Sequence, residues 1–201
     1  GATSEGDFHE ALNFAGVLEA PVVFLCQNNG WAISTPRACQ TASQTLAQKA
    51  HAYGIPAAQV DGNDALAVMQ VTQEAVALAR DKGQPAMIEA LTYRMEVHTT
   101  ADDPTRYRDE GEVEEWQDRD PIERVRKLLV ARSQLDDAMQ EALEEEIRDR
   151  IDAAWSEAKD RISRLEETPG TAMFDHIFAE PTAPLRRQRK EFSDQEEAAN
   201  D

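Results

Sequence analysis

The first 93 residues alternate between helical spacing of apolar side chains and short continuous apolar runs. Apolar residues recur at helical spacing over 5–19 and 65–82, which predicts two amphipathic helices. Short apolar runs bounded by turn residues predict buried strands at 21–27, 55–60 and 85–93. Strands that alternate with helices in this way predict a layered α/β domain, in which a parallel sheet is flanked by helices.

Local signals predict where these elements begin and end. Ser4 is a suitable N-cap for the first helix, and the "DGND" turn at 61–64 can cap the second. Gly83 suits the end of that second helix, because glycine adopts the left-handed conformation freely. A further helical segment is expected from Thr41 to Tyr53, and it leads through Gly54 into the next strand.

The pattern changes after Tyr93. Residues 94–111 are polar, rich in Thr, Asp and Arg, and follow neither period, which predicts a long loop of the kind that often carries function. Helices are expected at 121–131 and 136–166, the second with charges spaced for i,i+4 pairs on a solvated face.

We therefore expect three parts in the chain. Residues 1–110 belong to the α/β domain, and residues 111–190 form a helical extension that ends in a tail laid along a partner subunit. Residues 191–201 are expected to be disordered, because they are polar and terminal.

The charge balance limits the classes of partner. The chain has 39 acidic and 21 basic residues and a net charge of -18, so a nucleic-acid partner is not expected. Lysine is scarce along the whole chain, which favours a surface adapted to high salt over a local acidic docking surface.

Several absences favour a cytoplasmic protein. No apolar stretch is long enough to span a membrane, and the N-terminal residues lack the pattern of a signal peptide. Cys26 and Cys39 lack the spacing of a metal site and are too few for a disulfide framework, so both are interpreted as reduced structural thiols.

Three polar segments are expected at the carboxyl ends of the strands, where parallel α/β sheets bind ligands. The first is "GATSEG", a small-residue loop that leads into a helix and can present backbone N–H groups to a phosphate. The second is "NNGW" after the strand at 21–27, and the third is the loop that contains "EVHTTADDPTRYR". Each is a weak signal when taken alone.

The combination resembles the thiamine diphosphate motif, in which Gly-Asp-Gly precedes an Asn-Asn pair by a helix and a strand. Gly1 matches the last glycine of that motif, and Asn28 and Asn29 match the pair. The segments "GATSEGDFHEALNFAGVLEAPVVFLCQNNGWAISTP", "YGIPAAQVDGND" and "IEALTYR" resemble the alpha subunit of the thiamine-dependent 2-oxo acid dehydrogenases, most closely the branched-chain type. The resemblance covers about residues 1–132 and implies a thiamine diphosphate-binding fold whose N-terminal part, including Gly-Asp, is missing here.

The resemblance implies thiamine diphosphate and Mg²⁺ as cofactors. In the family, the main chain at Gly1 and Ala2 lies against the diphosphate. The side chain of Asn29 and the main-chain carbonyl of Trp31 are implied metal ligands, which agrees with the oxygen ligands that Mg²⁺ prefers. The principal carboxylate ligand, the Asp of Gly-Asp-Gly, has no counterpart in this chain.

The resemblance also assigns roles in the loop after the third strand. His98 is implied to be catalytic: it contacts the diphosphate and assists acyl transfer to a lipoyl group. Thr99 occupies a position where some relatives carry a phosphorylated Ser. Four residues are implied to order the loop through mutual hydrogen bonds and an Arg–Asp pair: Arg94, Asp102, Tyr107 and Arg108.

The implied function is oxidative decarboxylation of a 2-oxo acid with acyl transfer to a lipoyl group. The implied assembly is an α2β2 heterotetramer with a beta subunit, docked on a lipoyl acyltransferase core. Two alternatives stay open: a catalytically incomplete truncated chain that only binds its partner subunit, and an acetoin dehydrogenase alpha subunit. Pyruvate, branched-chain 2-oxo acids and acetoin are not separated by these residues.

Overall fold

The computed structural model describes residues 1–165 and 168–200. It divides the chain into two compact units, the first from Gly1 to Leu135 and the second beginning at Asp136.

A parallel three-stranded sheet forms the centre of the first unit. Its strands are β1 (Val23–Asn28), β4 (Ala57–Asp61) and β5 (Ala86–Leu91), with β5 in the middle of the order β1-β5-β4. In the register, Ile88 of β5 lies opposite Leu25 on one side and Ala58 on the other. The three predicted strands and their parallel arrangement are confirmed, with ends that differ by one or two residues.

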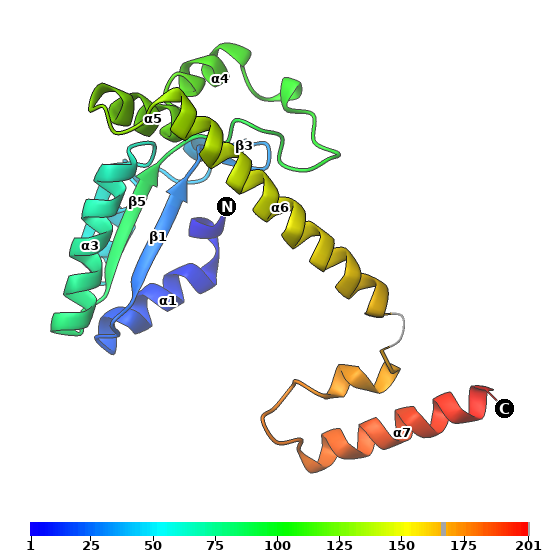
Figure 1. The fold of residues 1–201 in the computed structure, drawn as a ribbon. Coiled ribbons are helices and arrows are strands. Elements are labelled where there is room, and N and C mark those ends of the chain that lie inside the picture. Colours follow the sequence, from blue (N-terminus) through cyan, green and yellow to red (C-terminus); the bar gives the residue numbers. More distant parts are fainter. Residues whose placement is uncertain (166–167, 201) are drawn as a thin grey trace. The chain divides into compact units, whose positions relative to one another are not determined.

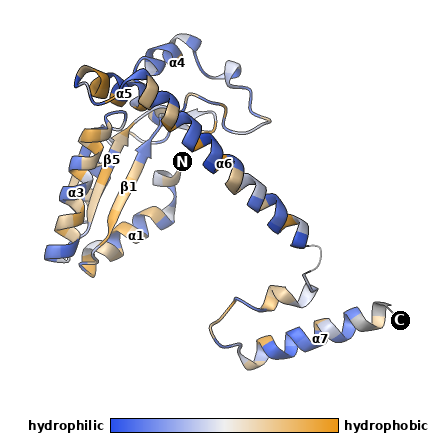
Figure 2. Ribbon diagram, in the orientation of Figure 1, coloured by the Kyte–Doolittle hydropathy of each residue, from blue (hydrophilic) through white to orange (hydrophobic). Residues whose placement is uncertain are grey.

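Helices cover both faces of this sheet (Figure 1). On one face lie α1 (Gly6–Val17) and α2 (Gln48–His51), and on the other lies α3 (Ala65–Lys82). Figure 2 shows the hydrophobic character of β1 and β5 between them. Successive side chains of β5 point to opposite faces and so contribute to two cores. The core on the α1 face contains Leu12, Ala15, Ala50, Ile55 and Met87, and the core on the α3 face contains Val60, Ala75, Ala86, Ile88 and Ala90.

The ends of α3 agree with the sequence, whereas the start of α1 does not. Asp64 Oδ1 accepts hydrogen bonds from the first-turn amides of α3, and Gly83 ends the helix in the left-handed region at φ 66°. Ser4 was expected to cap α1, but it lies in the short 3-10 helix η1 (Ala2–Ser4). Glu5 occupies the capping position of α1 and makes no side-chain capping bond.

The segment expected to be helical from Thr41 to Tyr53 is helical only in α2. The reason is an arginine that competes for its carbonyl groups: Arg37 Nη2 donates to the carbonyls of Ser43 at 2.5 Å and Gln44 at 2.7 Å. A second departure precedes it, where residues 31–36 form an antiparallel pair of two-residue strands that the hydrophobic pattern did not indicate. These strands are β2 (Trp31–Ala32) and β3 (Thr35–Pro36), followed by η2 (Arg37–Cys39).

After β5, the chain forms the expected loop and then returns to helix. The loop contains η3 (Pro104–Arg106), and it is followed by α4 (Glu110–Gln117) and α5 (Pro121–Ala131). Helix α5 has the predicted bounds, whereas α4 was not predicted.

Side chains of α4 and α5 bind these helices to the segment just after β5 and to β4, respectively. The ring of Tyr93 stacks on that of Trp116 with centroids 5.5 Å apart, and Arg124 pairs with Asp61 at 2.8 Å. These helices belong to the first unit, which extends to Leu135.

The second unit contains α6 (Asp137–Leu165), η4 (Gly170–Phe174) and α7 (Ala183–Asn200). Helix α6 corresponds to the helix predicted over 136–166, of which Glu166 lies outside the described residues. Arg189 pairs with Asp175 at 2.5 Å and thereby joins α7 to the segment after η4. Disorder was expected for 191–201, but residues 191–200 continue α7, and Asp201 lies outside the described residues. In the described part of the chain, no helix combines the length and apolar character that a membrane span requires.

Candidate functional site

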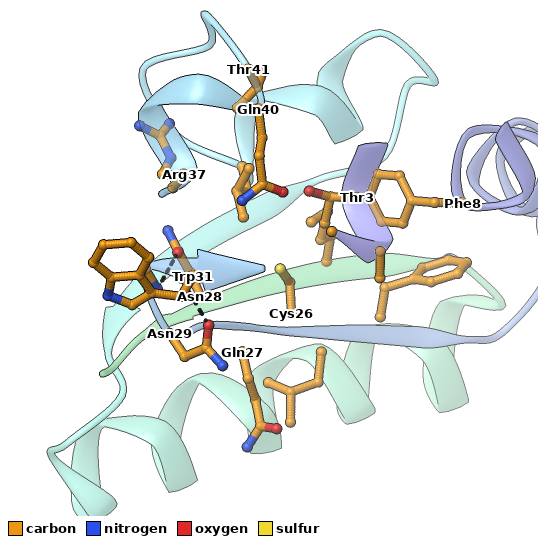
Figure 3. Close-up of a pocket in the computed structure, with 17 residues that line it drawn as sticks. Thr3, Phe8, Cys26, Gln27, Asn28, Asn29, Trp31, Arg37, Gln40 and Thr41 are labelled. Carbon is orange, nitrogen blue, oxygen red and sulfur yellow. Dashed lines mark hydrogen bonds between the residues drawn. The ribbon is translucent and has the colours of Figure 1, made fainter. Parts of the chain in front are cut away.

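A cavity of about 330 Å³ runs along β1 on the face covered by α1. Figure 3 shows Asn28, Asn29 and Trp31 at one end of this cavity and Thr3 and Phe8 toward the other. The small-residue turn before α1, β1 with the turn after it, and the segment after β3 all contribute to the wall. The lining residues are Gly1, Ala2, Thr3, Phe8, Phe24, Leu25, Cys26, Gln27, Asn28, Asn29, Gly30, Trp31, Arg37, Gln40, Thr41, Leu46 and Met87.

The charge of this lining is opposite to that of the chain. Although the chain carries a net charge of -18, the lining contributed by residues 1–165 and 168–200 includes no carboxylate and one guanidinium, that of Arg37. Arg37 Nε is buried and has no hydrogen-bond partner within the described part of the chain. Spare N–H capacity and the absence of carboxylates make the cavity suited to an anionic ligand.

The turn after β1 is held by its own asparagine side chains. Asn28 Oδ1 accepts from the amide of Gly30 at 3.3 Å, and Asn29 Oδ1 accepts from the amide of Trp31 at 3.1 Å. Gly30 has φ 81°, a left-handed conformation that glycine adopts without strain. The turn therefore holds the side chains of Asn28 and Asn29 at the end of the cavity.

Glu89 is a functional candidate that the sequence analysis missed. It is fully buried in β5 and accepts hydrogen bonds from Asn28 Nδ2, the Ala47 amide and Gln59 Nε2. The signal in the sequence is one carboxylate within the otherwise apolar run "PAMIEAL". Such a residue needs dedicated donors when the strand is buried on both faces.

The thiol of Cys26 also lines the cavity. Burial, with Glu89 nearby, raises the pKa of Cys26 above its ordinary value of 9.0. Cys26 and Cys39 are free cysteines, and Cys39 is exposed. A protonated Cys26 is a wall residue of the cavity rather than an activated nucleophile.

The loop after β5 brings together the residues that were expected to order it. Arg94 Nη2 donates to the Tyr107 hydroxyl at 2.9 Å and to the Ile33 carbonyl at 2.7 Å. The Tyr107 hydroxyl donates to Asp102 Oδ2 at 2.7 Å. Arg94 is thus linked to Asp102 through the Tyr107 hydroxyl, where a pair between Arg94 and Asp102 was expected.

Two further contacts complete the loop and connect it to the turn after β1. Arg108 donates to the carbonyls of Arg94 at 2.6 Å and Met95 at 2.8 Å. The rings of Trp31 and Tyr107 lie 5.2 Å apart and tilted, which joins the loop to a residue that lines the cavity.

The predicted site residues thus fall into two groups. Gly1, Ala2, Asn29 and Trp31 line the cavity together. His98 and Thr99 lie on the loop with exposed side chains, and neither lines the cavity. The main chain of His98 binds the loop, because its amide donates to Asp102 Oδ2 at 2.8 Å.

Loop order is expected to weaken at acidic pH. Hydrogen bonds from the Tyr107 hydroxyl and the His98 amide lower the pKa of Asp102 below its ordinary value of 3.8. Because the folded pKa is depressed, the stabilisation is present above the ordinary pKa and is lost as the pH falls through the folded pKa. Amide hydrogen exchange of residues 94–108, corrected for intrinsic rates, should therefore keep its protection at neutral pH and lose it as the pH falls below 3.8 and through the lower folded pKa.

The matched control for this prediction is Asp102→Asn, whose side chain still accepts hydrogen bonds but does not titrate. We expect weaker protection at neutral pH in this variant, with little further loss on acidification. An equal acid-dependent loss in both proteins would assign the effect to other groups.

The described residues alone do not form a metal centre. Within 1–165 and 168–200, no three His, Cys, Asp or Glu side chains are grouped so that they could hold a metal ion. A metal at the end of the cavity would meet neutral oxygens in this chain, namely the Asn29 amide and the Trp31 carbonyl. Neutral oxygens are ligands that Mg²⁺ accepts when carboxylate or phosphate oxygens complete the set.

A protein-family model described as dehydrogenase E1 component matches residues 1–165. The chain is 47% identical over 191 residues to the 3-methyl-2-oxobutanoate dehydrogenase subunit alpha of Mycobacterium tuberculosis, covering 95% of this chain and 51% of that protein. It is 44% identical over 197 residues to the pyruvate dehydrogenase E1 component subunit alpha of Staphylococcus epidermidis, covering 98% and 52%. The 2-oxoisovalerate dehydrogenase subunit alpha 2, mitochondrial, of Arabidopsis thaliana is 45% identical over 190 residues, covering 94% and 39%. The chain spans about half the length of the bacterial relatives it matches.

Proposed function

This chain belongs to the dehydrogenase E1 component family, and on that premise we propose that it is part of the alpha subunit of a thiamine diphosphate-dependent 2-oxo acid dehydrogenase. The reaction is oxidative decarboxylation of a 2-oxo acid with transfer of the acyl group to a lipoyl group. One observation carries the proposal: in a chain with a net charge of -18, the described residues that line the cavity between the N-terminal turn and the turn after β1 include no carboxylate.

The cavity suits the diphosphate group of the cofactor. Gly1 and Ala2 lie in its wall, and a Cβ atom added at Gly1 would be in van der Waals contact with the Ala32 Cβ at 3.4 Å. Arg37, another lining residue, adds a positive charge, and its Nε has no hydrogen-bond partner among the described residues. We assign the diphosphate to the end of the cavity at which the turn after β1 begins with Asn28.

Mg²⁺ would be held here through oxygens of the turn after β1. The ligands proposed in this chain are the side-chain oxygen of Asn29 and the carbonyl of Trp31, with diphosphate oxygens and a carboxylate from outside the described residues completing the set. When bound, thiamine diphosphate supplies the carbon nucleophile and the electron sink for decarboxylation. The protein residues bind, orient and exclude water.

His98 is proposed as the acid or base of acyl transfer. The loop that carries it is closed by Arg94, Asp102 and Tyr107 and contacts the cavity through the ring pair of Trp31 and Tyr107. An exposed imidazole on an ordered loop can donate a proton to a substrate group or accept one from it. Arg108 supports this position by binding the carbonyls at the start of the loop.

A beta subunit and a lipoyl acyltransferase core are the proposed partners, with an α2β2 assembly. Large apolar side chains on the outer surface of α1 and on β1 support contacts with further protein. Phe14 is 62% exposed, Val17 72%, Leu18 70% and Leu25 54%. Surfaces of this kind are usually covered in the assembled protein.

The proposal is tested by assembling the full-length subunit with its beta subunit and supplying thiamine diphosphate, Mg²⁺ and an electron acceptor. Release of carbon dioxide is measured with pyruvate and with 3-methyl-2-oxobutanoate, and oxidative cleavage with acetoin, because the sequence left these substrates open. Cofactor-dependent turnover of one of them is expected. A stable complex without cofactor uptake or turnover would favour the alternative of a subunit-binding module.

A further inference from the structure

Glu89 is a fully buried carboxylate in the central strand of the sheet. A buried carboxylate is costly unless donors satisfy its oxygens. Asn28 Nδ2 lies 2.7 Å from Oε1, the Ala47 amide lies 2.8 Å from Oε2, and Gln59 Nε2 lies 3.1 Å from Oε2. All three partners donate N–H groups, so Glu89 accepts every one of these bonds.

The three bonds join separate parts of the first unit. Asn28 ends β1 and lines the cavity, and Ala47 directly follows Leu46, which also lines it. Gln59 lies on β4 opposite Glu89 in the parallel ladder. One buried side chain therefore holds the end of β1, the segment before α2 and the far strand of the sheet.

The bond from Asn28 determines how that amide is turned. Because Nδ2 points to Glu89, Oδ1 is left to accept from the amide of Gly30, which it does at 3.3 Å. Gly30 stands between the two residues proposed to bind the metal, Asn29 and Trp31. The path from Glu89 to the metal ligands thus runs through one asparagine and one turn.

We propose that Glu89 is a positioning residue for the metal: it orients Asn28 so that the turn after β1 presents its oxygens to Mg²⁺. This inference rests on the proposed function, since it concerns the cofactor metal of the same cavity. Replacing a residue that hydrogen-bonds and orients a metal ligand typically lowers metal affinity by about 10- to 100-fold.

Residue 89 needs a side chain whose two terminal atoms both accept hydrogen bonds. In Glu89→Gln the side-chain oxygen must stay on the Ala47 amide, which is a main-chain donor and cannot turn. The new NH₂ group then faces Asn28 and forces its amide to flip, which places Nδ2 against the amide of Gly30. Two donors face each other, and the turn loses its hydrogen bond.

A second substitution restores the pattern without restoring Glu89. Asn28→Asp in the Glu89→Gln background provides a carboxylate that accepts from both the glutamine NH₂ and the Gly30 amide. Asn28→Asp alone places the new carboxylate next to that of Glu89, where the parent protein has a hydrogen bond of 2.7 Å, so the two negative charges repel. The four proteins form a double-mutant cycle in which the single variants are impaired and the double variant recovers.

Mg²⁺ is titrated by calorimetry into the full-length subunit assembled with its beta subunit, at saturating thiamine diphosphate. We expect about 10- to 100-fold weaker Mg²⁺ binding in Glu89→Gln. Asn28→Asp/Glu89→Gln should return to within about threefold of the parent protein. Thermal unfolding of each protein is recorded in parallel.

Gln59→Met is the matched control, because it removes another bond to Glu89 on the side away from Asn28. A merely structural role for Glu89 predicts that Mg²⁺ affinity follows thermal stability in every variant, including Gln59→Met. The positioning role predicts that Gln59→Met keeps its Mg²⁺ affinity even if it melts earlier.

The outcomes separate this inference from the proposed function. Parent protein that binds no thiamine diphosphate and no Mg²⁺ overturns both. Parent protein that binds them normally, with unchanged Mg²⁺ affinity in Glu89→Gln, overturns the positioning role alone. If Glu89→Gln does not fold, the double variant decides: a folded double variant with weak Mg²⁺ binding overturns the role, and one with recovered binding supports it.

Discussion

Replacing Gly16 with alanine is expected to lower the free energy of unfolding by about 2 to 3 kcal/mol, because the new methyl group meets main chain that cannot move aside cheaply. A Cβ atom at this position of α1 would collide with the carbonyl oxygen of Tyr53 and would lie 3.7 Å from Ile55 Cγ1. The collision would push α1 away from the core that contains Leu12 and Ile55. Urea unfolding followed by circular dichroism measures the change.

Gly6→Ala, near the start of the same helix, is the control. A Cβ atom at Gly6 meets nothing within 4 Å, so this change should be neutral or stabilising by up to about 1 kcal/mol. Equal stability of the two variants would contradict the close approach of α1 to the segment before β4.

His98→Ala is expected to reduce the turnover number of the assembled enzyme by between about a hundredfold and ten thousandfold, the range typical of a lost acid or base. The loop itself should stay closed. The hydrogen bond from residue 98 to Asp102 is donated by the main-chain amide, which alanine retains. The hydrogen bonds among Arg94, Tyr107 and Asp102 do not involve the imidazole. Turnover with a lipoyl acceptor and amide exchange of the loop are measured on the same samples.

His51→Ala is the control for this substitution, because His51 is an exposed histidine on α2 in the same unit. It should leave turnover unchanged. Loss of loop protection in His98→Ala would assign the defect to loop order, and normal turnover with an ordered loop would remove His98 from the chemistry.

The sequence predicted the strands and helices whose hydrophobic pattern agrees with the turn and capping residues at their ends. The parallel strands, α3 with its caps at Asp64 and Gly83, and α5 follow from local signals, and the family expected from "GATSEG" and "NNGW" is confirmed. Helix formation over 41–53 was overestimated, because Arg37 binds carbonyls there from outside the segment. A hydrogen bond from a side chain outside the segment leaves no trace in the spacing of apolar residues.

The part of the site formed by consecutive residues could be predicted from the sequence. The part formed by residues that only the strand pairing brings together could not. The turn from Asn28 to Trp31 can be read directly, since Asn and Gly favour such turns. The role of Glu89 depends on donors from three distant segments, which only the strand register brings together. Helix α4 was missed because its contact with the sheet, the stacking of Trp116 on Tyr93, leaves no regular apolar stripe.

The central claim is that the cavity along β1 binds thiamine diphosphate through Mg²⁺. Its most direct test is a calorimetric titration of thiamine diphosphate into the full-length subunit assembled with its beta subunit, first with Mg²⁺ and then with a chelator. We predict saturable binding with Mg²⁺ that becomes about tenfold weaker or more when the metal is removed. Absence of binding in the presence of Mg²⁺, or equal affinity with and without the metal, would contradict the claim.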